Sequence, residues 1–289
     1  MSAQQIPDTV FQYKISKPHF EKGKGPVLAV DQAHHNFHRL DGRFAAFGKL
    51  LGGDGYTVQK NEYPFTIKSL QKIDVLVVSN ALNERNAGED WSLPTPSAFS
   101  AEEIKALNQW VTNGGHLLLI ADHMPMAGAA ADLASSFGIQ FENTFALDSR
   151  KRTIEYFTKV DGTLQSNSVT SATTNHPAVD SVVNFTGSAF KATGKITPLI
   201  ILDDQYQLVY PDTAWKFHPN TRSVSGKGFY QLALLKYGKG KIIISAEAAM
   251  FSAQLAGADK KPMGFNNPAA KNNPQLILNL FEWLNATDQ

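Results

Sequence analysis

Four short apolar segments, each followed by polar residues, constrain the fold of this chain most strongly. They cover residues 27–30, 74–78, 116–121 and 241–245, and the polar residues that follow them are Asp31, Ser79, Asn80, Asp122, His123 and Glu247. Apolar runs of this length, bounded by turn residues, are typical of buried strands in a parallel sheet. Strands alternate with helical patterns in the first half of the chain, which indicates right-handed crossovers. We therefore expect an α/β fold with a doubly wound, mostly parallel sheet.

Apolar residues recur at helical spacing between these segments and after the last one. The spacing predicts helices over residues 39–51, 100–113, 129–137 and 274–284. Ser100 and Glu103 have the spacing of a capping box at the start of the second helix. Residues 150–230 are rich in Thr, Ser, Asn and Gly and contain short β-like runs, so a β-rich insert is expected there. We expect a polar lead-in over residues 1–24 and one domain over residues 25–289.

The composition narrows the classes of partner and cofactor. With 27 basic and 26 acidic residues among 289, the chain has no electrostatic footprint for nucleic acid. It contains no apolar run of the roughly 18 residues that membrane insertion requires. Gly23 and Gly25 precede the first strand, whereas a dinucleotide fingerprint follows its strand, so no nucleotide cofactor is indicated. Localisation stays open between export with a removed signal peptide and the cytoplasm.

Three histidines, His34, His35 and His38, follow the first predicted strand within seven residues of Asp31. Carboxyl ends of parallel strands meet at one edge of a sheet, where ligands commonly bind. Imidazole and carboxylate groups suit a divalent metal, zinc first and manganese or iron next. The predicted metal ligands are Asp31, His34, His38 and His123. The alternative is structural: Asp31 or Asn36 caps the next helix, and the histidines bond to neighbouring backbone.

Two acids at strand ends, Asp122 and Glu247, are the predicted catalytic residues. In the metal-assisted hypothesis, either of them acts as general base towards a metal-bound water with a pKa near ~7. The polar loop 81–99, which carries Trp91, is long enough to predict a mobile lid over the site. The chain has no G-x-S-x-G motif, and the roles of His35, His176 and Ser252 stay open.

The segments VLAVDQAHHNFH, GGHLLLIADHMPMAG, GKGKIIISAEAAMFSAQ and NNPQLILNLFEWL resemble the class I glutamine amidotransferase-like superfamily. Within it, the chain is most similar to a branch akin to gliding-motility auxiliary and trehalose-utilisation proteins. The resemblance implies a flavodoxin-like sheet with the site at the carboxyl ends of its strands. It also implies a cysteine nucleophile after a central strand, but this chain has no cysteine at all. Glutaminase chemistry by that nucleophile is therefore excluded.

The favoured hypothesis is a hydrolase that acts on a small polar substrate, such as a carbohydrate derivative, with metal assistance. A second hypothesis is a ligand-binding domain that kept the cleft and lost the nucleophile. A third is a metal-free enzyme in which a histidine and a carboxylate perform acid–base chemistry. Fold alone does not separate them. The expected partner is a small molecule, and the oligomeric state is not predicted.

Overall fold

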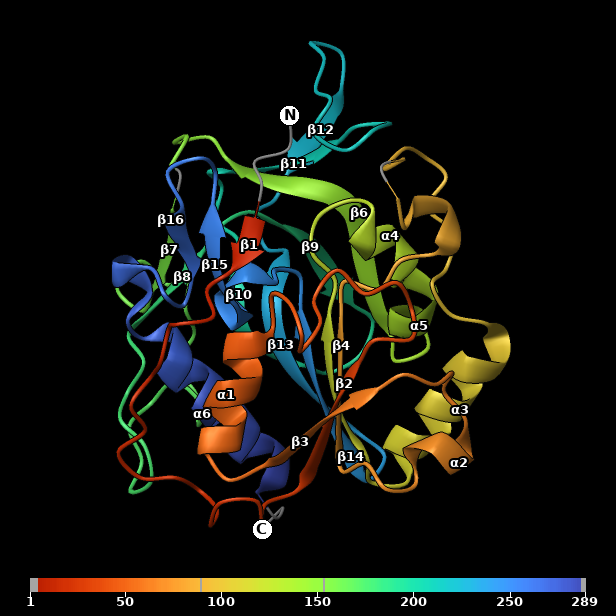
Figure 1. Ribbon diagram of the computed structural model, residues 1–289. Helices are drawn as coiled ribbons and strands as arrows, with labels where there is room; N and C mark the ends of the chain where they lie inside the picture. The colour runs from red at the N-terminus through yellow and green to blue at the C-terminus, as the bar shows by residue number, and fades with distance from the viewer. Residues whose placement is uncertain (1–4, 89, 153, 287–289) are drawn as a thin grey trace.

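The structure, a computed structural model, describes residues 5–88, 90–152 and 154–286 (Figure 1). Glu89 of the predicted lid loop lies outside the described residues. Within them, sixteen strands form one eleven-stranded sheet and two small sheets. Strands of the large sheet come from both halves of the chain, from β2 near the start to β14 near the end.

One part of the large sheet is parallel, as the apolar segments predict. Its strands run in the order β3, β2, β4, β5, β14, and their bounds are Thr57–Asn61, Val27–Asp31, Val75–Ser79, His116–Ile120 and Gly240–Ser245. Side chains of β2, β4, β5 and β14 are almost all buried, because these strands are covered on both faces, whereas the edge strand β3 is mostly exposed. The carboxyl ends of β4, β5 and β14 are level, since Ser79 pairs with Ile120 and Ile120 pairs with Ser245.

The rest of the large sheet is antiparallel, so the expected mostly parallel, flavodoxin-like doubly wound fold is wrong. Beyond β14 the order continues with β13, β9, β6, β11 and β12, while β10 also pairs with β13; their bounds are Tyr230–Tyr237, Gly187–Ala192, Ile139–Asp148, Tyr206–Tyr210, Arg222–Ser225 and Thr197–Ile201. The cause is topological: the tight turn at Gly238 returns the chain as a hairpin, and a hairpin pairs its strands antiparallel. Much of the predicted β-rich insert therefore extends the main sheet.

Two small sheets complete the β structure. Strands β7 (Glu155–Thr158) and β8 (Ser181–Asn184) form one of them. Strand β1 (Gln5–Pro7) joins β15 (Ala253–Ala256) and β16 (Lys261–Gly264) in the other. The described part of the predicted polar lead-in thus contains a strand that pairs with the C-terminal part of the chain.

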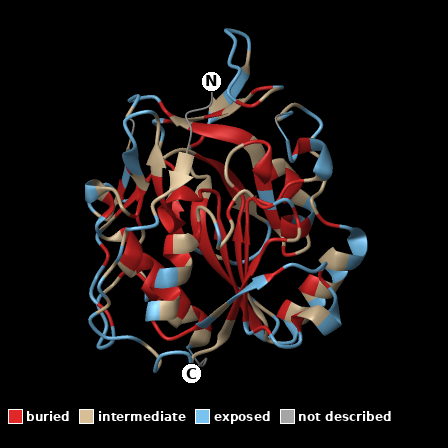
Figure 2. Cartoon of the chain, in the orientation of Figure 1, coloured by how far each residue is buried: buried red, intermediate tan, exposed pale blue. Residues whose placement is uncertain are grey.

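Helices cover both faces of the parallel strands (Figures 1 and 2). On one face, α1 (Ala45–Gly53) and α6 (Asn273–Asn285) pack against alternate strand residues such as Val30 and Val77. The intervening residues, such as Ala29 and Val78, face the other layer, which contains α2, α3 and α5 (Ile67–Leu70, Ala101–Thr112 and Ala131–Ser135). Short helix α4 (Met126–Ala129) precedes α5. This alternation follows the two-residue period of a strand.

Helix α3 begins as the sequence predicts. Its capping box is complete: Ser100 Oγ accepts a hydrogen bond from the Glu103 backbone N–H, and the Glu103 carboxylate accepts one from the Ser100 N–H. The predicted helix over 39–51 begins later, at Ala45, and that over 129–137 is divided between α4 and α5. No helix in the described ranges is long and apolar enough to cross a membrane.

Candidate functional site

Two acids follow the neighbouring strands β5 and β14, as predicted. Glu247 is fully buried, whereas Asp122 keeps part of its surface exposed. Three backbone N–H groups donate to the Glu247 carboxyl: Ala249 at 2.9 Å, Met250 at 2.7 Å and Phe185 at 3.4 Å. Glu247 therefore holds the turn after β14, including the 3₁₀ helix Ala249–Phe251.

The pKa values of both carboxyls are raised above their ordinary values. Burial and the charge of Asp122 raise the pKa of Glu247 well above its ordinary value, although the backbone donors oppose the shift. Burial also raises the pKa of Asp122, although hydrogen bonds from the His123 backbone N–H and from Asn80 oppose the shift. Two neighbouring carboxyls at a desolvated site do not ionise together at ordinary cost, so ionisation of one disfavours ionisation of the other.

A third buried acid, Glu155 at the start of β7, was missed by sequence reasoning. Burial, together with the charge of Asp148, raises the pKa of Glu155 to about 8. Its Oε2 accepts a hydrogen bond from the Tyr206 hydroxyl at 3.3 Å. Strand β7 pairs with β8, and Glu155 lies opposite Asn184, the residue before the Phe185 donor to Glu247. No sequence signal identifies this residue, because its proximity depends on antiparallel pairing across a long connection.

Strained backbone surrounds this edge of the sheet. Several non-glycine residues with positive φ lie in the segments that follow its strands or hold Glu247, namely His35, Asn80, Thr186 and Trp215. Asn80 shows what the strain achieves: its Oδ1 accepts a hydrogen bond from the Asp122 N–H at 2.9 Å, and its side chain also bonds to the Asp122 carboxyl. Each such conformation costs about 1–3 kcal/mol and is typical of functional sites.

His123 is surrounded by aromatic rings. Its ring stacks on the ring of Phe145 with a centroid distance of 4.5 Å. It also makes a T-shaped contact with the Trp215 ring at a centroid distance of 4.7 Å. Its Nδ1 lies 2.7 Å from the carbonyl oxygen of Met124, which only accepts, so Nδ1 carries the proton. In the described part of the chain, Nε2 has no hydrogen-bond partner and is left as an acceptor.

The predicted lid loop 81–99 lies beside His123, since the Trp91 ring is 6.2 Å from it. The loop is tied to residues 212–214: Ser92 pairs with Thr213, and the Ala214 N–H donates to the Trp91 carbonyl at 2.9 Å. Its position over the strand ends agrees with a lid, and its mobility stays a prediction.

Asp31, His34 and Glu103 form a separate network at the end of β2. His34 Nδ1 lies 2.8 Å from Asp31 Oδ2, and His34 Nε2 lies 2.8 Å from Glu103 Oε1. Burial lowers the pKa of His34, but the hydrogen bonds and charges of the two carboxylates outweigh it and raise the pKa. Both ring nitrogens face carboxylate oxygens, so neither is free to bind a metal.

His38 is a core residue. It stacks on Phe44 at 4.7 Å, and its Nδ1 lies 3.2 Å from Ser79 Oγ. Burial and the charge of Arg43 lower the pKa of His38 to about 3, so the ring stays neutral.

The structure does not bring the four predicted metal ligands together as one set. Asp31 and His34 bond to each other, His38 lies in the core, and His123 belongs to the aromatic group beside Asp122. Across the described residues, no group of three or more His, Asp or Glu side chains is arranged to hold a metal ion. Binding of zinc, manganese or iron stays a prediction without an assigned ligand set.

Three further residues had open roles. His35 is exposed with φ +47°, which favours a turn role. His176 lies away from the strand ends, with Nδ1 3.1 Å from the Pro177 carbonyl and Nε2 3.7 Å from Glu282 of α6. Ser252 is buried and donates to the Ala249 carbonyl at 3.1 Å, so it is not a nucleophile exposed to substrate.

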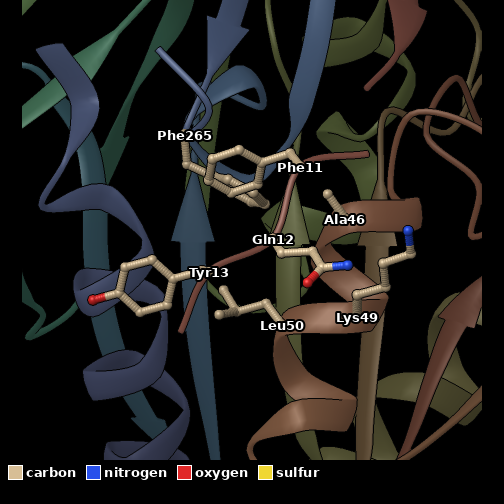
Figure 3. A pocket seen from close by; sticks show the side chains of 7 residues that line it. All are labelled: Phe11, Gln12, Tyr13, Ala46, Lys49, Leu50 and Phe265. Atoms are coloured by element: carbon tan, nitrogen blue, oxygen red, sulfur yellow. The ribbon is translucent and has the colours of Figure 1, made fainter. Parts of the chain in front are cut away.

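Two surface cavities lie away from these acids. The first, of about 270 Å³, lies between the N-terminal segment and α1 (Figure 3), and its lining is Phe11, Gln12, Tyr13, Ala46, Lys49, Leu50 and Phe265. Lys49, its one charged side chain, donates to the Thr9 carbonyl at 2.6 Å. The second, of about 460 Å³, includes Asp74 and His116 at the amino ends of β4 and β5. Neither brings titratable groups together as the strand ends do.

Comparison with known proteins gives a family and a fold. The family model "Domain of unknown function (DUF4350)" matches residues 44–256. No curated protein matches the chain. The chain is similar in structure to the "mmIFT52 N-terminal domain" (13% identity, TM-score 0.61, 91% of this chain and 99% of that one). It is also similar to "Cytoplasmic Protein STM1381" from Salmonella typhimurium LT2 (13% identity, TM-score 0.51, 89% and 98%). At these identities the likeness shows the fold alone.

The family match corrects the expected superfamily. The sequence segments resemble class I glutamine amidotransferase-like proteins, but the matching model is DUF4350, and the sheet is mixed rather than flavodoxin-like. The resemblance rested on the apolar strands and the polar residues at their ends. Those features recur wherever parallel strands deliver polar residues to one edge.

Proposed function

The chain belongs to the DUF4350 family, and we propose that it is a hydrolase of a small polar substrate in which Asp122 transfers the protons. One observation carries the proposal: a partly exposed aspartate lies beside a fully buried glutamate at the carboxyl ends of adjacent parallel strands. Titratable groups with pKa values shifted by burial and by each other are typical of acid–base sites.

The residues have distinct roles in this proposal. Glu247 holds the proton of the pair, so Asp122 carries the negative charge and accepts a proton from an attacking water molecule. His123 Nε2 accepts the second hydrogen of that water and orients it. Asp122 then delivers its proton to the leaving group, which restores the starting state. Asn80 is a positioning residue, because it bonds to both the backbone and the side chain of Asp122.

The test is hydrolysis of chromogenic p-nitrophenyl esters and glycosides by the purified chain. Asp122→Asn should lower kcat by about 10²–10⁴-fold, the range for loss of a general base, without lowering the thermal midpoint. Asp204→Asn, which alters an exposed aspartate in the β10–β11 turn, is the matched control and should keep full activity. An unchanged kcat in Asp122→Asn would refute the assigned role.

A second candidate function, a non-catalytic binding domain, is favoured by one specific observation. Each oxygen of the Glu247 carboxyl accepts backbone N–H groups, which is the contact pattern of a structural cap. In this alternative, none of the chromogenic substrates is hydrolysed, and Glu247→Gln lowers stability alone.

A further inference from the structure

An exposed aromatic surface adjoins the proposed site. Trp215 and Phe217 are 50% and 40% exposed, and both contact the buried ring of Phe145 at centroid distances of 4.6 and 5.3 Å. Phe145 in turn stacks on His123, the neighbour of Asp122. We call Trp215, Phe217 and Phe145 the aromatic shelf.

The exposure of Trp215 is enforced by the backbone. Its φ of +65° is unusual for a bulky residue and costs about 1–3 kcal/mol. The segment is held in place because Ala214 N–H donates to the Trp91 carbonyl at 2.9 Å and Lys216 N–H donates to the Thr213 carbonyl at 3.1 Å. A large ring held in solvent by strained backbone, next to titratable groups, indicates a binding surface.

The charges around the shelf select the class of ligand. Outside it, Arg85 lies 3.5 Å from Asp90, and the charges of both Arg85 and Lys216 act on that carboxylate. These two cations disfavour a cationic ligand. Inside it, the negative charge that the proposed function gives to Asp122 disfavours an anionic one. A neutral ligand is repelled neither by the two cations nor by Asp122, so the charges favour this class of ligand.

Polar groups near the shelf add a requirement for hydroxyls. Asp122 and His123 Nε2 accept hydrogen bonds. A ring with one apolar C–H face for stacking and hydroxyls at its edge satisfies both sets of contacts.

We infer that the aromatic shelf is a subsite for a neutral sugar ring, which stacks on Trp215 and directs its hydroxyls towards Asp122 and His123. This inference names the substrate class of the proposed hydrolase, and it rests on the proposed function only where it takes Asp122 to be charged and places the bond to be hydrolysed near it. The binding of a sugar on the shelf would be the same in a non-catalytic domain.

The test is calorimetric titration of the whole chain with cellobiose and maltose as neutral probes and with choline chloride as a cationic one. We expect saturable binding of at least one disaccharide with a Kd of about 1 mM or below, and none of choline. Trp215→Ala should weaken that binding by about tenfold, and Trp215→Phe should restore most of it. Tyr63→Ala, which removes a 70% exposed ring beyond β3, is the matched control and should leave the Kd unchanged.

Choline binding in place of the sugars, no binding of either disaccharide, or equal Kd values for wild type and Trp215→Ala would each overturn the inference. Sugar binding without hydrolysis would support the shelf and refute the hydrolase, so the two failures are distinguishable. Because Trp215 is half-exposed, its replacement should leave the thermal midpoint unchanged. A raised Kd in Trp215→Ala would then reflect the lost stacking contact and not unfolding of the variant.

Discussion

Replacing Glu155 with glutamine should stabilise the protein at alkaline pH. Burial and the Asp148 charge raise the pKa of Glu155 to about 8 in the folded chain, against an ordinary value of 4.5. The folded state therefore holds this proton where the unfolded state has released it. The contribution of protonated Glu155 to the free energy of unfolding is fully present below about pH 4.5 and is lost as the pH rises towards 8.

The magnitude follows from the two pKa values. Each pKa unit is worth about 1.4 kcal/mol, so ionising Glu155 inside the fold costs up to about 5 kcal/mol. Glutamine has nearly the same shape and still accepts the Tyr206 hydroxyl bond, but it has no charge to bury. In the wild type, the free energy of unfolding should therefore fall by about 1.4 kcal/mol per pH unit between about pH 4.5 and 8 because of Glu155. The variant should lack this contribution to the slope.

Urea unfolding at about pH 5, 7 and 9 measures this slope for wild type and variant. Glu142→Gln is the control: Glu142 also accepts a tyrosine hydroxyl, from Tyr210 at 2.8 Å, but it is only partly buried. The control should keep the wild-type slope. An identical slope in Glu155→Gln and wild type would refute the reasoning, because Glu155 would then ionise in the folded protein without cost.

Two further predictions concern the stability of the site. His34→Ala should lower the free energy of unfolding by about 3–5 kcal/mol in urea, because it leaves two carboxylates without their shared buried partner; exposed His218→Ala should change it little, and an equal loss in both would contradict the network. Gly187→Ala should cost about 1–3 kcal/mol by thermal unfolding, since its Cβ would lie 2.4 Å from the Ala246 carbonyl. Gly194→Ala meets nothing within 4 Å and should be neutral, so equal midpoints for the two variants would show that the contact between β9 and the Ala246 carbonyl adjusts without cost.

The parallel half of the fold was predictable because its signal is local. Each apolar run is long enough to form a buried strand, and Gly or capping residues mark the helix ends, as at Ser100. The antiparallel half was not predictable in topology. Segments such as β9 and β11 are short and separated by long connections, so their partners are chosen by packing against β6 and β13 rather than by local pattern.

The candidate site divides in the same way. Asp122 and Glu247 meet because strand ends in a parallel sheet meet, which the sequence pattern predicts. The histidines misled the prediction, because spacing does not reveal which ring faces the core: His38 packs on Phe44, and His34 is held between two carboxylates, one of them distant Glu103. Glu155 and Trp215 reach the site from connections whose path no periodicity encodes.

The proposed function requires that Asp122 and Glu247 share one proton at neutral pH, and infrared spectroscopy of the carboxyl groups tests this central requirement most directly. The Glu155→Gln variant serves as background, because Glu155 would contribute its own protonated band. We predict a band from a protonated carboxyl at neutral pH that disappears when Glu247→Gln is added and persists when Glu142→Gln is added instead. A neutral-pH spectrum in which all carboxyls are ionised would contradict the claim.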